Sequence, residues 1–143
     1  MSSDLVFTLD RVGAALRADE IAFATDSDGD ISVRWSDGDH VLITTGGARK
    51  QMLVSNYSHR GRYPLEKFAA LCEASNTWNK NQYFPKAYVH RRKDDSVCVM
   101  GEIITDLDYG CSDEHLGLLV TVIVRTSVQL GKAVETWLAP PPG

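Results

Sequence analysis

Short runs of alternating apolar and polar residues fill most of the first half of the chain. Four such runs lie at residues 21–23, 31–35, 41–45 and 51–57. A period of two is typical of β-strands with one buried face. The later runs are separated by residue pairs that tolerate the positive φ of tight turns: Asp28-Gly29, Asp37-Gly38 and Gly46-Gly47. Because consecutive strands joined by short turns pair in antiparallel orientation, this pattern predicts an antiparallel meander and argues against a fold built from βαβ units.

Three other segments have the apolar spacing of amphipathic helices. They are expected at residues 5–16, 65–76 and 113–137. Each has a residue suited to its start: Ser3, Pro64 and Ser112. The third helix is expected to run toward Trp137, before the proline run at 140–142.

Two further strands, 86–92 and 97–104, are expected to form a hairpin around Asp94-Asp95. The order of elements is then αββββαββα. A length of 143 residues is that of one domain, spanning residues 1–143. The sequence therefore predicts an α+β fold in which an antiparallel sheet of five to six strands carries helices on one face.

The charge balance bears on possible partners. The net charge is −4, from 19 acidic and 15 basic residues. Because nonspecific binding to phosphate backbones needs an excess of Lys and Arg, we do not expect a nucleic-acid partner. The longest apolar run, residues 116–124, is about half as long as a membrane span requires, and Arg125 ends it, so no membrane partner is expected either.

The cysteines and the N-terminus bear on the compartment. Cys72, Cys98 and Cys111 are widely spaced and include no Cys-x-x-Cys pair, which is typical of free thiols in a reducing compartment. The first residues have neither the basic nor the apolar region of a secretory signal. We therefore expect a cytoplasmic protein.

Motifs that could carry metal or cofactor chemistry are weak. Asp26-Ser27-Asp28-Gly29-Asp30 resembles the start of a calcium loop, but Ile31 stands where that loop needs glycine. The histidines are scattered, and no phosphate-binding glycine motif occurs. We expect no cofactor and no metal site, and we assign no catalytic residue. The best enzyme alternative is a thiol pair, Cys111 and His115, at the start of the last helix.

Two short basic stretches stand out in this acidic chain. They are His59-Arg60-Gly61-Arg62 and His90-Arg91-Arg92-Lys93. Protection of a strand edge by charge explains the second stretch without a ligand. A site for an anion or an acidic partner, formed by both stretches together, is the alternative.

The last helix has an apolar arc about twice as wide as one sheet contact requires. Contact with the first helix would cover the surplus, and so would a second copy of the chain. For the second case we predict a homodimer whose surface includes Val120, Val124 and Val128.

The order of elements and several motifs resemble the YbjN domain family over nearly the whole chain. The motifs are the Asp26–Asp30 turn, Asn76-Thr77-Trp78-Asn79, the run Phe84–Val89, and Cys111-Ser112-Asp113-Glu114. The family is described as "putative bacterial sensory transduction regulators", and its fold resembles type III secretion chaperones. The resemblance implies a non-enzymatic, regulator-like or chaperone-like protein that is dimeric and binds a protein partner of unknown identity. It supplies no catalytic residue.

Residues 76–85 are expected to form a loop that tucks its aromatic side chains inward. In it, the amides of Asn76 and Asn79 would satisfy backbone groups at the helix end, and Trp78, Tyr83 and Phe84 would fill the gap between helix and sheet. The alternative is a sensor of small molecules or anions, because concave loops lined by aromatics and amides form ligand pockets. The candidate residues of this loop site are Asn76, Trp78, Asn79, Phe84 and Lys86.

Overall fold

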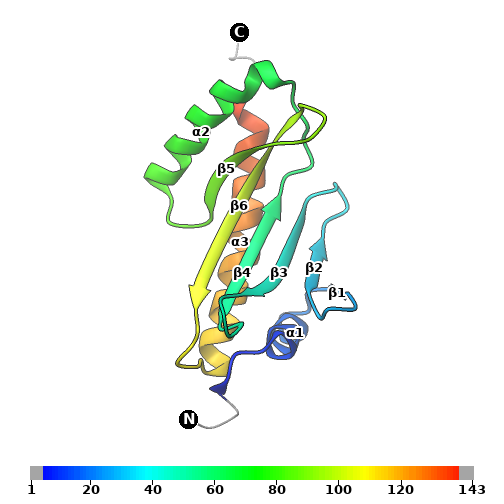
Figure 1. Cartoon of the computed structure of the whole chain (residues 1–143), viewed down its shortest axis with the longest axis vertical. Coiled ribbons are helices and arrows are strands. Elements are labelled where there is room, and N and C mark those ends of the chain that lie inside the picture. Colours follow the sequence, from blue (N-terminus) through cyan, green and yellow to red (C-terminus); the bar gives the residue numbers. More distant parts are fainter. Residues whose placement is uncertain (1–4, 139–143) are drawn as a thin grey trace.

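The computed structural model describes residues 5–138, which form one six-stranded sheet and three α-helices (Figure 1). The strands are β1 (Ala24–Thr25), β2 (Ile31–Arg34), β3 (His40–Gly46), β4 (Met52–Ser58), β5 (Lys86–Arg91) and β6 (Val97–Asp106). They lie in the order β1-β2-β3-β4-β6-β5, and every neighbouring pair is antiparallel. The predicted α+β class and the order αββββαββα are confirmed. The strand predicted at 21–23 was wrong, because the tight turn at 26–30 brings only Ala24 and Thr25 alongside β2.

The first and last helices differ in how well their starts were predicted. Helix α3 (Asp113–Trp137) begins as predicted, with the Ser112 side chain accepting a hydrogen bond from the His115 backbone N–H. Helix α1 (Leu9–Ala18) begins four residues later than predicted, because Thr8 provides the N-cap. The proposed cap Ser3 and the proline run at 140–142 lie outside the described residues.

The second helix extends beyond the predicted end. Pro64 precedes a short 3-10 helix, η2 (Leu65–Lys67), which leads into α2 (Phe68–Asn81). The expected end near Asn76 was wrong, because residues 76–81 include neither glycine nor proline and the next helix breaker is Pro85. Asn76, Trp78 and Asn79 are therefore helical, and the loop before β5 is only four residues long.

Helix α3 lies along the sheet, behind it in Figure 1, and α1 packs against its first half. Alternate residues of β4 face this layer and are buried, including Leu53, Ser55 and Tyr57. Gly131 allows the close approach of helix and sheet, since a Cβ there would lie 2.5 Å from the Tyr57 hydroxyl oxygen. Helix α2 packs along β5, at the edge of the sheet.

The apolar arc of α3 is largely used inside the chain. By length and composition alone this helix could cross a membrane. Most of its apolar residues nevertheless pack against the sheet and α1, as in the core helix of a folded domain, whereas Leu118 is exposed. Packing against α1 is thus the first of the two explanations given above for the wide apolar arc of α3.

Candidate functional site

The C-terminal turns of α2 are joined to β5 by side-chain hydrogen bonds. The Trp78 indole N–H donates to the Pro85 carbonyl at 2.8 Å. The Asn79 amide donates to the Ala87 carbonyl at 3.0 Å and accepts from the Ala87 N–H at 2.8 Å. The Asn79 side chain thus takes the place that a neighbouring strand would occupy at the outer edge of β5.

The other predicted residues of this site are dispersed. Asn76 is exposed on α2, and the Lys86 ammonium pairs with Glu102 at 2.8 Å. The expectation that Tyr83 and Phe84 point inward was wrong, since their exposed fractions are 96% and 49%. Pro85, the last residue of this short loop, is buried instead and lies close to Gly101 of β6.

A groove opens between the C-terminal ends of α2 and α3. Its volume is about 310 Å³, and it is lined by Ala74, Thr77, Trp78, Asn81, Gln82 and Trp137. We call it the aromatic groove. Trp137 was predicted only as the end of a helix, and its role in the groove needs the packing of two elements that are far apart in the sequence.

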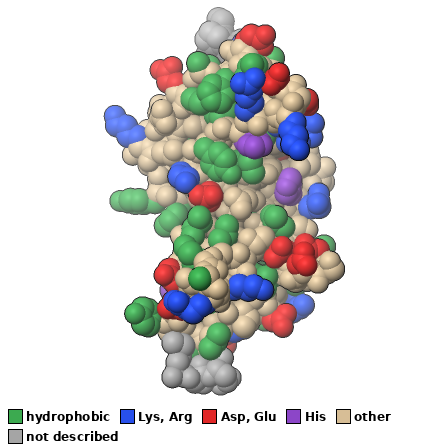
Figure 2. Space-filling view, viewed as in Figure 1, with side chains coloured by type: hydrophobic (Ala, Val, Ile, Leu, Met, Phe, Trp, Pro, Cys, Tyr) green, Lys and Arg blue, Asp and Glu red, His purple; other side chains and the backbone are tan. Residues whose placement is uncertain are grey.

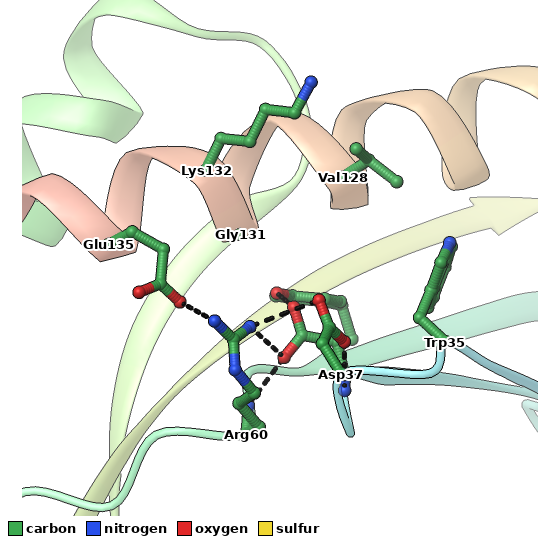
Figure 3. Close-up of a pocket in the computed structure, with 9 residues that line it drawn as sticks. Trp35, Asp37, Arg60, Val128, Gly131, Lys132 and Glu135 are labelled. Carbon is green, nitrogen blue, oxygen red and sulfur yellow. Dashed lines mark hydrogen bonds and ion pairs between the residues drawn. The ribbon is translucent and has the colours of Figure 1, made fainter.

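A second, polar pocket lies between the β2–β3 turn, the end of β4 and α3 (Figure 3). Its volume is about 180 Å³. Its walls are Trp35, Asp37, Asp39, Tyr57, Arg60, Val128, Gly131, Lys132 and Glu135.

Asp39 is the buried centre of this pocket. One carboxylate oxygen accepts from the Tyr57 hydroxyl at 2.6 Å, and the other accepts from the Arg60 backbone N–H at 2.8 Å and from its guanidinium at 3.2 Å. The guanidinium also pairs with Asp37 and with Glu135 of α3. Burial, and then the hydrogen bond to Asp39, raise the pKa of Tyr57 far above its ordinary value of 10, so the phenol stays protonated.

His59 extends the network on the other side of Glu135. Its ring is buried, and Nδ1 accepts from the Gly61 N–H at 2.9 Å. The proton of the neutral ring is therefore on Nε2, which donates to the Glu135 carboxylate at 2.7 Å. The three carboxylates of this pocket are engaged by Tyr57, His59 and Arg60, and the evident effect of these contacts is to hold α3 against the end of β4.

The proposed thiol pair is not joined in the structure. Cys111 is buried just before α3, and its sulfur lies 3.8 Å from the guanidinium of Arg11. The same guanidinium donates to the Cys111 carbonyl and to Asp113, both at 2.8 Å. Among the described residues, the side-chain hydrogen bonds of Cys111 lead to Arg11, whereas His115 is exposed.

The acidic turn between β1 and β2 brings three carboxylates together. Oxygens of Asp26, Asp28 and Asp30 lie within 4.8 Å of one another. The Asp26 carboxylate accepts from the backbone N–H groups of Asp28 and Asp30, at 2.9 and 3.0 Å. These bonds are those of a turn stabilised by an aspartate side chain. Partial burial, and then the two neighbouring carboxylates, raise the pKa of Asp30.

The three valines proposed for a dimer surface do not share one environment. Val120 is fully buried in the core of the single chain, so its side chain is not available to a partner. Val124 is partly exposed beside the end of α1, and Val128 is partly exposed at the wall of the polar pocket.

Comparison with known proteins gives a family match and a shared fold. The YbjN family model, described as "Putative bacterial sensory transduction regulator", matches residues 8–136. No curated protein matches the chain. The crystal structure of E. coli YbjN, "a putative transcription regulator", superimposes with a TM-score of 0.75 over 98% of this chain and 100% of that chain, at 14% identity. The Yersinia pestis type III secretion chaperone SycH, in complex with a fragment of YscM2, gives a TM-score of 0.49 over 86% of this chain and 99% of that chain, at 15% identity.

Proposed function

The chain belongs to the YbjN family, and from this premise we propose that it is a non-enzymatic regulatory protein that acts by binding another protein. The observation that supports the proposal is the aromatic groove. Tryptophan and tyrosine are the residue types most enriched where proteins bind one another. The groove has two tryptophans in its walls, and the exposed Tyr83 and Phe84 follow it in the chain.

The groove is suited to an apolar side chain of a partner. None of the six residues that line it is charged. The Trp78 ring is held in place by its bond to Pro85, so little side-chain freedom is lost when a partner binds. The amides of Asn81 and Gln82 lie in the same lining and provide donors and acceptors for the partner's backbone.

Site-specific crosslinking in the native host tests this proposal. A photoreactive side chain replaces the exposed Gln82, and in a control chain it replaces the exposed Asp28 in the turn before β2. We expect the chain with the photoreactive residue at position 82 to crosslink to one discrete protein. The control chain, with that residue at position 28, should not crosslink to the same protein. The added substitution Trp137→Ala should abolish the crosslink while the circular dichroism spectrum is kept. Absence of a crosslink at Gln82, or an identical set of crosslinks at both positions, would contradict the proposal.

We further propose that the chain is a cytoplasmic homodimer. Three free cysteines suit a reducing compartment. Val124 and Val128 lie on one flank of α3 and are partly exposed, so they are the candidates for an interface that excludes Val120.

Light scattering coupled to size exclusion measures the mass. A dimer has about twice the chain mass of 15.8 kDa. Val124→Asp should halve the mass without loss of the fold, because an unpaired charge is costly at a desolvated interface. A wild-type monomer at tens of micromolar would refute the dimer.

A further inference from the structure

The two basic stretches of the sequence meet at one end of the sheet, on the face that looks away from α3. A cavity of about 430 Å³ lies there, lined by Gly38, His40, Ser58, His59, Arg60, Arg62, His90, Arg92, Cys98 and Met100. A shallower hollow beside it adds Lys93 and Asp94. The upper right of Figure 2 shows histidines and Lys or Arg side chains gathered on this face. We call His40, Arg62, His90, Arg92 and Lys93 the basic cluster.

Strand register explains why these residues meet. His40 pairs with Ser58, Ser58 with Met100, and Cys98 with His90 across three neighbouring strand pairs. Their side chains share one face because directly paired residues point the same way. Arg62 joins them because the next residue, Tyr63, forms a bridge to Val97 at the start of β6.

The charge in this cavity is unbalanced. No aspartate or glutamate is among the ten residues that line it. Arg62 and Arg92 form no ion pair within residues 5–138, although the whole chain is acidic. Arg60 also lines the cavity, but its guanidinium is engaged by the carboxylates of the polar pocket.

Asp94 is the one carboxylate among the residues that line the adjoining hollow. Its oxygen accepts from the Ser96 N–H at 2.9 Å and from the Ser96 hydroxyl at 2.6 Å. These bonds are the main cause that lowers the pKa of Asp94, and Arg62 and Arg92 lower it further. One carboxylate faces three cations in the adjoining hollow, so a positive excess remains.

Protection of a strand edge explains only part of the cluster. Strand β5 is an edge strand, so charge on it hinders pairing with other chains. Arg62, however, follows β4, which lies inside the sheet between β3 and β6. A charge at the position of Arg62 therefore does not protect an edge strand.

We propose that this cavity binds the phosphate group of a small phosphorylated molecule. Guanidinium groups match phosphate oxygens with paired N–H donors, and the His90 imidazole and the Ser58 hydroxyl supply further donors. The volume falls within the range of pockets for small ligands, and Cys98 and Met100 provide an apolar floor for the rest of the molecule. The cavity and the aromatic groove have no residue in common, so the proposal adds a ligand input to the proposed protein binding and does not depend on it.

Calorimetric titration at low ionic strength with inorganic pyrophosphate and with adenosine monophosphate tests this site. The variant carries Arg62→Gln and Arg92→Gln together, and the matched control is Arg125→Gln on the exposed side of α3. We expect saturable binding of one or both probes to the wild type. Loss of two charged donors should weaken it by about tenfold or more, and the control should bind like the wild type. Tighter binding of the nucleotide identifies an organic phosphate as the ligand, and tighter binding of pyrophosphate an inorganic one.

Other outcomes would overturn the proposal. One is the absence of saturable binding of either probe up to millimolar concentration. Another is equal binding by the double variant and the wild type, which would place the anion elsewhere. Tighter binding of hexaglutamate or of a single-stranded oligonucleotide than of both small probes would assign the cluster to an acidic macromolecule.

Discussion

Arg60 and Arg62 are two residues apart in one basic stretch, yet they lie in opposite electrostatic environments. The Arg60 guanidinium is paired with Asp37, Asp39 and Glu135 in the polar pocket (Figure 3). Arg62 has no ion pair within residues 5–138 and lines the cavity on the other face with a second arginine. The difference arises from distant parts of the chain, because Asp39 comes from the β2–β3 turn and Glu135 from the last helix.

The comparison separates a structural use of charge from a binding use. A cation surrounded by carboxylates has its field cancelled locally and contributes to the packing of α3. Two neighbouring cations without partners repel each other, and that repulsion is relieved when an anion binds. The polar pocket should therefore respond to mutation through stability, and the basic cluster through binding.

The largest effect is expected at the centre of the polar pocket. Asp39→Ala removes the acceptor of three hydrogen bonds and leaves the Tyr57 hydroxyl buried without a partner. Loss of one member of a buried charged network costs about 3–5 kcal/mol. Urea denaturation measures this loss as a fall in the free energy of unfolding.

Asp37→Ala is the control for that substitution. Half of the Asp37 side chain is exposed, and it accepts one hydrogen bond from the Asp39 backbone N–H at 2.9 Å and contacts the Arg60 guanidinium at 3.3 Å. We therefore expect a smaller loss, of about 1–2 kcal/mol. Equal losses for the two variants would break the comparison, because the pocket would then not be organised around Asp39.

Tyr57→Phe should have an intermediate effect that depends on pH. At neutral pH it removes one hydrogen bond to a buried carboxylate, which costs about 1.5–3 kcal/mol. The raised pKa of Tyr57 means that the unfolded chain ionises first as the pH rises above about 10. The wild type therefore loses stability above that pH, and the variant should lose less.

Urea denaturation between neutral and alkaline pH measures this difference. Some alkaline loss should remain in the variant, since burial also raises the pKa of Tyr63 and of Tyr88. If the two proteins lost stability in parallel above pH 10, the Tyr57 phenol would not be the group that titrates differently on folding.

The sequence predicts the sheet well because its signals are local. The period-two runs at 31–35, 41–45 and 51–57, the Asp-Gly turns and the Ser112 cap each lie within a few residues of the element they specify, and they appear in the structure. The run at 21–23, which is only three residues long, does not form a strand. The end of α2 was mispredicted because Asn76 and Asn79 resemble turn residues. The bond between Asn79 and Ala87 forms only once helix and strand have packed.

The candidate sites were predicted less completely for the same reason. Trp78 was identified, but its groove needs Trp137, which is distant in sequence. The basic stretches were visible as charges, whereas the separation of Arg60 from Arg62 depends on the register of β4 with β6 and on the approach of α3. Residue type indicated which groups carry charge, and tertiary packing decided which charges are neutralised.

The smallest effect on stability is expected in the basic cluster, and it sharpens the comparison most. Arg62→Gln with Arg92→Gln should change the free energy of unfolding by no more than about 0.5 kcal/mol, because neither guanidinium forms an ion pair within residues 5–138. A small gain is expected at low ionic strength, since the substitution removes repulsion between like charges, and salt should abolish the gain. Urea denaturation at low and high salt measures the change in the free energy of unfolding and its dependence on salt. A loss as large as that of Asp39→Ala would mean that the two arginines stabilise the fold, and the distinction between the two faces would fail.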